Sequence, residues 1–75
     1  MNNAEVRDFY FERSNGEYVL LAANVTEKEA MKIMHEFLDI HKFKSYYTRV
    51  CDVGDKRIYD VGSHTEFFIW TKEAL

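Results

Sequence analysis

The 75-residue sequence has no proline, one cysteine and three glycines. A single cysteine excludes an internal disulfide, and a lone thiol is typical of a reducing compartment. The first residues have neither the basic region nor the apolar run of a secretory signal. No stretch approaches the roughly 18 consecutive apolar residues that a membrane-spanning helix needs. We therefore expect a cytoplasmic protein without a membrane segment.

An excess of basic charge is also lacking, because 13 acidic residues outnumber 10 basic ones and give a net charge of −3. A strongly basic domain would indicate nucleic-acid binding, and this composition argues against it. Apolar residues are 47% of the chain and aromatic residues 16%. This share is sufficient for one folded domain over residues 1–75, although a core of this size gives marginal stability.

The N-terminal third has the pattern of a β-hairpin. Residues 6–13 and 17–25 are predicted strands, and Asn15-Gly16 between them is typical of a two-residue turn, because both residue types tolerate positive φ. A turn centred there places Phe11 opposite Leu20 and Phe9 opposite Ala22 in the paired strands.

A helix is predicted to follow this hairpin. The segment Thr26-Glu27-Lys28-Glu29 matches a capping box, in which the threonine and the second glutamate satisfy each other's backbone amides. Beyond it, apolar positions recur at helical spacing until about His41. The apolar stripe consists of Ala30, Ile33, Met34, Phe37, Leu38 and His41.

Three further strands are predicted after the helix, at residues 45–53, 57–61 and 64–71. Gly54-Asp55 and Gly62-Ser63 supply the turns between them. The order is therefore ββαβββ. The expected fold class is α+β, a four- or five-stranded antiparallel sheet with one helix packed on one face.

The Gly54-Asp55 turn fixes a register for the strands on either side of it. It places Asp52 opposite Arg57 and Arg49 opposite Asp60, and such opposite-charge pairs support the alignment. The same register puts Cys51 among apolar neighbours, so we expect a buried, structural cysteine.

One helix covers only one face of such a sheet, yet residues 19–22 and 67–70 are apolar on both faces of their strands. Apolar surface on an uncovered face indicates an interface, where tyrosine is a common residue. We therefore expect Tyr10 and Tyr59 to face outward, and the chain to form a homodimer.

Reactive residue types concentrate in residues 60–66, where an aspartate, a serine and a histidine occur together. A tight turn would direct them to alternate faces, and no nucleophile elbow precedes the serine. We predict no catalytic residue and no enzyme. This segment is instead a small polar turn or a binding loop using His64 and Glu66.

A metal centre is not expected either. His35 and Asp39 lie one helical turn apart on the polar side of the predicted helix. Two ligands without a third are a weak basis for a metal site. We predict no metal ion and no cofactor.

Basic and aromatic residues alternate between the helix and the third strand. The segment contains Lys42, Lys44, Tyr46, Tyr47 and Arg49 and no acidic residue. Such side chains can bind phosphates and stack on bases. The alternative is a basic helix end that leads into an aromatic strand, so both interpretations stay open.

Part of the sequence resembles a known group of proteins. The segments Tyr46-Tyr47-Thr48-Arg49 and 59–68 (YDVGSHTEFF) are similar to the C-terminal half of small proteins encoded by phages and mobile elements of Gram-positive bacteria. The resemblance covers about a third of the chain. It implies a setting in which small acidic proteins inhibit host defence, anti-CRISPR proteins among them.

Together these patterns predict a non-enzymatic binding protein that blocks a host protein or ribonucleoprotein, such as a CRISPR effector. The main alternative is a sponge or sensor that captures a nucleotide through residues 42–49 and the 60–66 turn. A third possibility is a subunit of a phage assembly.

Overall fold

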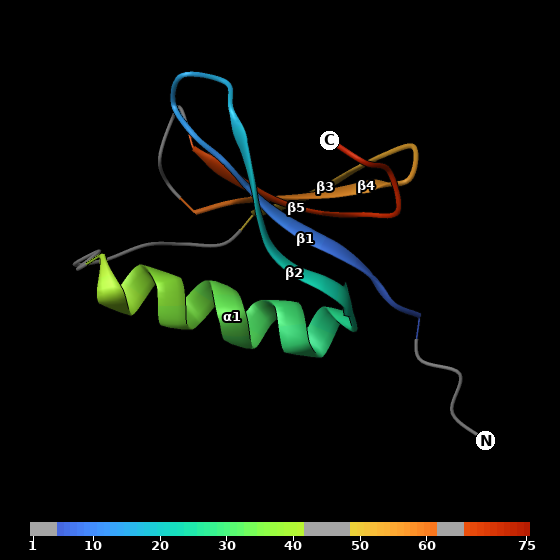
Figure 1. Cartoon of the computed structure of the whole chain (residues 1–75), viewed down its shortest axis with the longest axis horizontal. Helices are drawn as coiled ribbons and strands as arrows, with labels where there is room; N and C mark the ends of the chain where they lie inside the picture. The colour runs from blue at the N-terminus through green and yellow to red at the C-terminus, as the bar shows by residue number, and fades with distance from the viewer. Residues whose placement is uncertain (1–4, 42–48, 62–65) are drawn as a thin grey trace.

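A computed structural model of the protein describes residues 5–41, 49–61 and 66–75. One helix and one five-stranded antiparallel sheet form an α+β fold with the predicted ββαβββ order (Figure 1). In chain order the elements are β1 (Arg7–Glu12), β2 (Tyr18–Val25), α1 (Glu27–Ile40), β3 (Arg49–Val53), β4 (Lys56–Asp60) and β5 (Phe67–Thr71).

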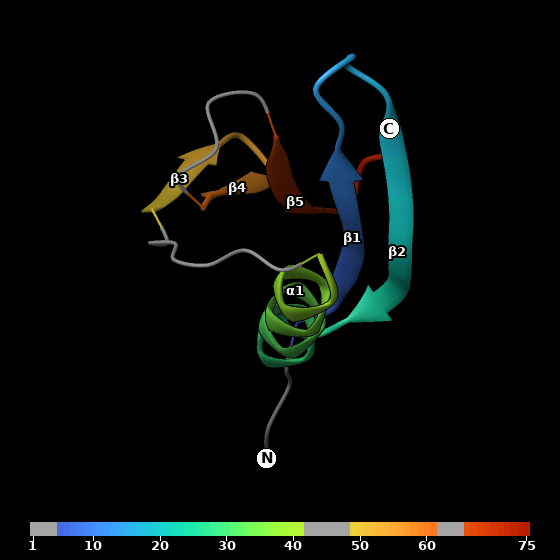
Figure 2. The ribbon, with the colours of Figure 1, turned by 90° about the vertical axis from the view of Figure 1, so that its left-hand side faces the viewer.

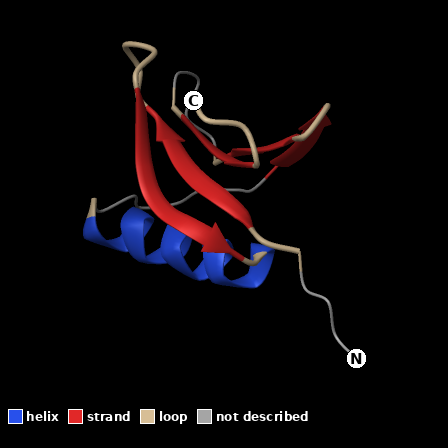
Figure 3. Ribbon diagram, turned by 45° about the vertical axis from the view of Figure 1, so that its right-hand side comes forward, coloured by secondary structure: helices blue, strands red, loops and turns tan. Residues whose placement is uncertain are grey.

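The strands lie in the order β2-β1-β5-β4-β3. The last strand therefore joins the two hairpins, because β5 pairs with β1 on one side and with β4 on the other. The helix α1 runs along one side of the sheet, below β1 and β2 in Figure 2. Figure 3 shows the same arrangement with the β1–β2 hairpin in front.

The β1–β2 hairpin is present with the predicted Phe9–Ala22 pair, but the predicted register is wrong next to the turn. Arg13 and Glu17 close a three-residue loop in which the Gly16 amide donates to the Arg13 carbonyl at 2.9 Å. Gly16 has φ +89° and adds one residue to the loop, as in a type I turn followed by a glycine bulge. Consequently Phe11 lies opposite Val19 and not Leu20.

The β3–β4 hairpin has the predicted register. Arg49 lies opposite Asp60 and Asp52 lies opposite Arg57. The second pair is an ion pair, with 2.8 Å between Arg57 Nε and Asp52 Oδ1. The expected burial of Cys51 is wrong, because β3 is an edge strand and all five of its residues are exposed.

The helix begins at the predicted capping box. The Thr26 Oγ1 accepts from the Glu29 amide at 3.2 Å, and Glu29 Oε1 accepts from the Thr26 amide at 2.8 Å. Such a cap stabilises a helix by about 1 kcal/mol. His41 follows the last helical residue and is exposed, with its ring stacked on Phe37 at 4.2 Å between centroids.

The core lies between α1 and the facing side of the sheet. Ala30, Met34 and Leu38 are fully buried there. They pack against a cluster of aromatic side chains from three strands. This cluster contains Phe9, Phe11, Tyr59, Phe68 and Trp70.

Of the two tyrosines expected to face outward, Tyr59 does not, whereas Tyr10 does but has a buried side chain. Tyr59 is 1% exposed, and it points toward the helix because it lies opposite Phe68 of the core. Tyr10 points to the other face of the sheet but is only 6% exposed. Its hydroxyl accepts from the Leu75 amide at 3.4 Å, so the residues after β5 pass beside it.

Candidate functional site

The face of the sheet directed away from α1, called here the outer face, carries two rows of side chains that cross several strands. Residues directly opposite each other in a sheet point to the same face. The first row is Glu12, Phe67, Asp60 and Arg49, from β1, β5, β4 and β3. The second row is Tyr10, Ile69, Ile58 and Cys51, from the same four strands.

A cavity of about 410 Å³ lies over part of these two rows. Pockets that bind small ligands or single anchoring groups have volumes of about 300–1,000 Å³ and are mainly apolar with a few placed charges. Three apolar and three charged residues line this one, so its composition is of that type. The described residues that line it are Glu12, Arg49, Cys51, Ile58, Asp60 and Phe67.

The cavity is lined by more negative than positive side chains. Arg49 and Asp60 lie directly opposite each other on neighbouring strands, and both already have interaction partners. Glu12 is half-buried, and its carboxylate has no hydrogen-bond or ion-pair partner among the residues that the structure describes. Two carboxylates therefore face one guanidinium, and the cavity attracts a cation more than an anion.

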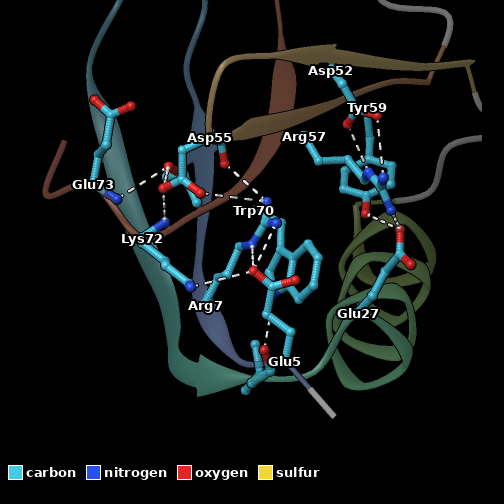
Figure 4. Close-up of polar contacts among 12 residues, drawn as sticks. Glu5, Arg7, Glu27, Asp52, Asp55, Arg57, Tyr59, Trp70, Lys72 and Glu73 are labelled. Carbon is cyan, nitrogen blue, oxygen red and sulfur yellow. Dashed lines mark hydrogen bonds and ion pairs between the residues drawn. The ribbon is translucent and has the colours of Figure 1, made fainter. Parts of the chain in front are cut away.

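A polar cluster on the other side of the sheet ties the start of α1 to the β3–β4 hairpin (Figure 4). Arg57 Nη1 lies 2.9 Å from Glu27 Oε2, and its Nε lies 2.8 Å from Asp52 Oδ1. The Tyr59 hydroxyl donates to the same Glu27 oxygen at 2.7 Å. The bond from Tyr59, and then that from Arg57, lowers the pKa of Glu27 below its ordinary value.

A second cluster holds the segment after β5 (Figure 4). The Asp55 carboxylate accepts from the Lys72 amide at 2.9 Å, and the Asp55 carbonyl accepts from Arg7 Nη1 at 2.9 Å. The Arg7 guanidinium lies over the Trp70 ring, 4.4 Å from its centroid. The charged groups within each cluster are paired with one another. We therefore assign both clusters a role in stabilising the fold and not in ligand binding.

Of the nine binding residues predicted from sequence, the structure describes four. Arg49 lines it, and Glu66 is half-buried directly before β5. Tyr10 and Tyr59 are buried, as described above. The other five lie outside the described residues: Lys42, Lys44, Tyr46, Tyr47 and His64.

Five of the six described lining residues were not predicted from sequence to be binding residues. The pairing of Arg49 with Asp60 could be predicted from the Gly54-Asp55 turn. The position of Glu12 at the cavity could not be predicted, because it depends on the pairing of β5 with β1. The strand alternation of Phe67 and Ile58 indicated their face, but no local signal indicated which strands are neighbours.

In the described part of the chain, no group of three or more histidine, cysteine, aspartate or glutamate side chains is placed to hold a metal ion. Over the same residues, no helix is long and apolar enough to cross a membrane. Comparisons with protein-family models, curated proteins and solved structures found no match for this chain.

Proposed function

We propose that the protein is a non-enzymatic binding protein of the cytoplasm that engages another macromolecule through the outer face of its sheet. The cavity is the observation that carries this proposal. Protein interfaces obtain most of their binding energy from a few side chains that fill desolvated pockets. A cavity of about 410 Å³ has room for one large side chain of a partner.

Exposed apolar residues extend this surface on both sides of the cavity. Leu20 lies opposite Tyr10 at one side and is 53% exposed. Val53, on the same face of β3 as Cys51, is 55% exposed at the other side. Exposed apolar residues around a pocket are typical of an interaction surface.

The resemblance to phage and mobile-element proteins suggests the target. We propose that the bound macromolecule is a host defence component, such as a CRISPR effector, and that binding blocks its function. The small size and net charge of −3 suit a protein that covers a basic surface.

A plaque assay tests this function. Expression of the protein in bacteria whose CRISPR system targets an infecting phage is expected to restore plaques. Cys51→Arg fills the cavity and adds one positive charge, so it is expected to abolish the rescue. Ser14→Arg adds the same charge in the exposed β1–β2 loop and serves as the matched control. No rescue by the unmodified protein, or equal rescue by both variants, would contradict the proposal.

The nucleotide-capture alternative has less support. Of its basic residues the structure describes Arg49, and the cavity beside Arg49 carries two carboxylates. A nucleotide phosphate would be repelled there. Calorimetry with a panel of nucleotides checks this directly, and submicromolar binding without plaque rescue would favour the alternative.

We also propose that the protein forms a homodimer through β2. This strand is at a sheet edge, and three consecutive apolar residues on it are exposed: Tyr18 by 41%, Val19 by 38% and Leu20 by 53%. The register shifts of β2 lie beyond this stretch, so the stretch itself is regular enough to pair with a second copy.

Light scattering at micromolar concentration is therefore expected to give twice the chain mass of 9.0 kDa. Val19→Lys places a charge on the edge strand and is expected to return the mass to that of one chain. Val50→Lys makes the same change on the other edge strand, β3, and is expected to leave the dimer intact. A monomer at high concentration would refute the homodimer.

A further inference from the structure

We propose that the outer-face cavity receives an arginine side chain of the partner, with its guanidinium paired to Glu12 and stacked on Phe67. This inference rests on the proposed function and names the chemistry by which the same surface recognises its partner. It follows from the charges, the ring and the apolar wall of the cavity.

Glu12 supplies the charge for this pairing. Its carboxylate is half-buried and without a partner in the described part of the chain, whereas Arg49 and Asp60 both have partners. A half-buried carboxylate at an interface is stabilised when a cation from the other side pairs with it. The ligand group is therefore expected to be positively charged.

Phe67 favours a guanidinium over an ammonium ion. It lies directly opposite Glu12 on the neighbouring strand, so its half-buried ring and the carboxylate point to the same face. A planar guanidinium can stack on an aromatic ring while it forms two parallel hydrogen bonds with a carboxylate. A lysine ammonium ion is more strongly hydrated and lacks this bidentate geometry.

The rest of the cavity suits the aliphatic part of an arginine. Ile58 and Cys51 belong to the second row, next to the row that carries the charges, and they offer apolar surface to the three methylene groups. Because the ligand is one side chain, the partner is expected to present an exposed arginine. Surfaces that bind nucleic acid are rich in such residues.

Blocked tripeptides test the pairing without knowledge of the partner. The probes are acetyl-Gly-Arg-Gly-amide, its lysine counterpart, and its norleucine counterpart, which keeps an aliphatic chain without charge. Each is titrated into ¹⁵N-labelled protein and followed by NMR. The arginine peptide is expected to bind most tightly and to shift the amide signals of Glu12, Phe67, Ile58 and Cys51.

Glu12→Gln is expected to weaken binding of the arginine peptide about tenfold, because it removes the charge and keeps the shape. Glu36→Gln removes an equal charge from the exposed side of α1 and is expected to leave binding unchanged. Thermal melting of both variants checks that they are folded. Equal binding of the norleucine peptide, or equal weakening by the two variants, would overturn the inference.

The outcomes separate this inference from the proposed function. If no peptide binds while Cys51→Arg still abolishes plaque rescue, the outer face is the binding surface and the arginine assignment is wrong. If the arginine peptide binds at the cavity but the protein rescues no plaques, the assignment of the cavity holds and the defence target is wrong.

Discussion

Phe68→Ala is expected to destabilise the protein by about 3–5 kcal/mol, the usual cost of removing a buried phenylalanine side chain. Phe68 is 1% exposed on the central strand β5. Its ring centroid lies 5.7 Å from that of Phe9, 5.2 Å from that of Phe11 and 5.4 Å from that of Phe37. Truncation therefore opens a cavity at the point where two strands and the helix meet.

The loss is large compared with the stability expected of so short a chain. At about 0.05–0.15 kcal/mol per residue, the protein has a free energy of unfolding of roughly 4–11 kcal/mol. A loss of about 3–5 kcal/mol corresponds to a fall in melting temperature of roughly 12–40 °C. The variant is expected to be partly or largely unfolded at 37 °C.

Thermal unfolding followed by circular dichroism measures this effect at one protein concentration. Ile40→Ala is the control, because Ile40 is 75% exposed at the end of α1. Its melting temperature is expected to stay within about 4 °C of the unmodified protein, since exposed substitutions change stability by about 0.5 kcal/mol or less. Similar shifts for the two variants would show that the core is not centred on Phe68.

The parts of the fold that depend on local signals could be predicted from sequence. The capping box at Thr26 fixed the start of the helix, and Gly54-Asp55 fixed the register of β3 and β4. The β1–β2 register next to the turn could not be obtained in the same way. Asn15-Gly16 is compatible with both two- and three-residue loops, and the structure adopts the longer one.

The candidate site depended on information that local patterns do not contain. The cavity forms because β5, at the end of the chain, pairs with β1, near its beginning. Glu12 and Phe67 are therefore neighbours in space although they are 55 positions apart in the sequence. The alternation of a strand indicates which residues share a face, but not which strands lie next to each other.

Tyr59 illustrates the same limit for a single side chain. A tyrosine has a polar hydroxyl, which made an outward position on the sheet reasonable. In the structure, Glu27 at the start of α1 accepts the hydrogen bond of that hydroxyl, and the ring is buried in the core. The two residues are 32 positions apart, so the sequence alone does not reveal the contact that makes burial possible.

Tyr59→Ala is accordingly expected to act on stability and not directly on partner binding. Removal of the buried ring should cost about 3–5 kcal/mol, as for Phe68. Tyr59→Phe keeps the ring and removes only the hydroxyl, so the expected cost is about 1 kcal/mol. That value is at the low end for a bond to a carboxylate, because the Glu27 side chain is 40% exposed. Thermal unfolding of both variants at pH 7 gives the two costs.

The pH dependence of the Tyr59→Phe cost identifies the hydroxyl bond as its source. The pKa of Glu27 is lowered below its ordinary 4.5, first by Tyr59 and then by Arg57. A carboxyl group of this kind contributes its full stability above pH 4.5, and the contribution is lost as the pH falls through the lowered pKa. The difference in melting temperature between the unmodified protein and Tyr59→Phe should therefore narrow below pH 4.5.

At alkaline pH the Tyr59 phenol itself makes stability depend on pH, and this contribution is lost as the pH rises. Burial, followed by the bond to Glu27, raises the pKa of Tyr59 above its ordinary 10.0. A phenol whose pKa is raised in the folded state contributes stability below pH 10, and this contribution is lost as the pH rises further. Phenylalanine does not titrate, so the Tyr59→Phe variant lacks this loss. The difference between the two proteins should thus be constant between about pH 5 and 9 and narrow on either side. A difference that widened in acid would mean that the Tyr59 hydroxyl does not donate to the Glu27 carboxylate.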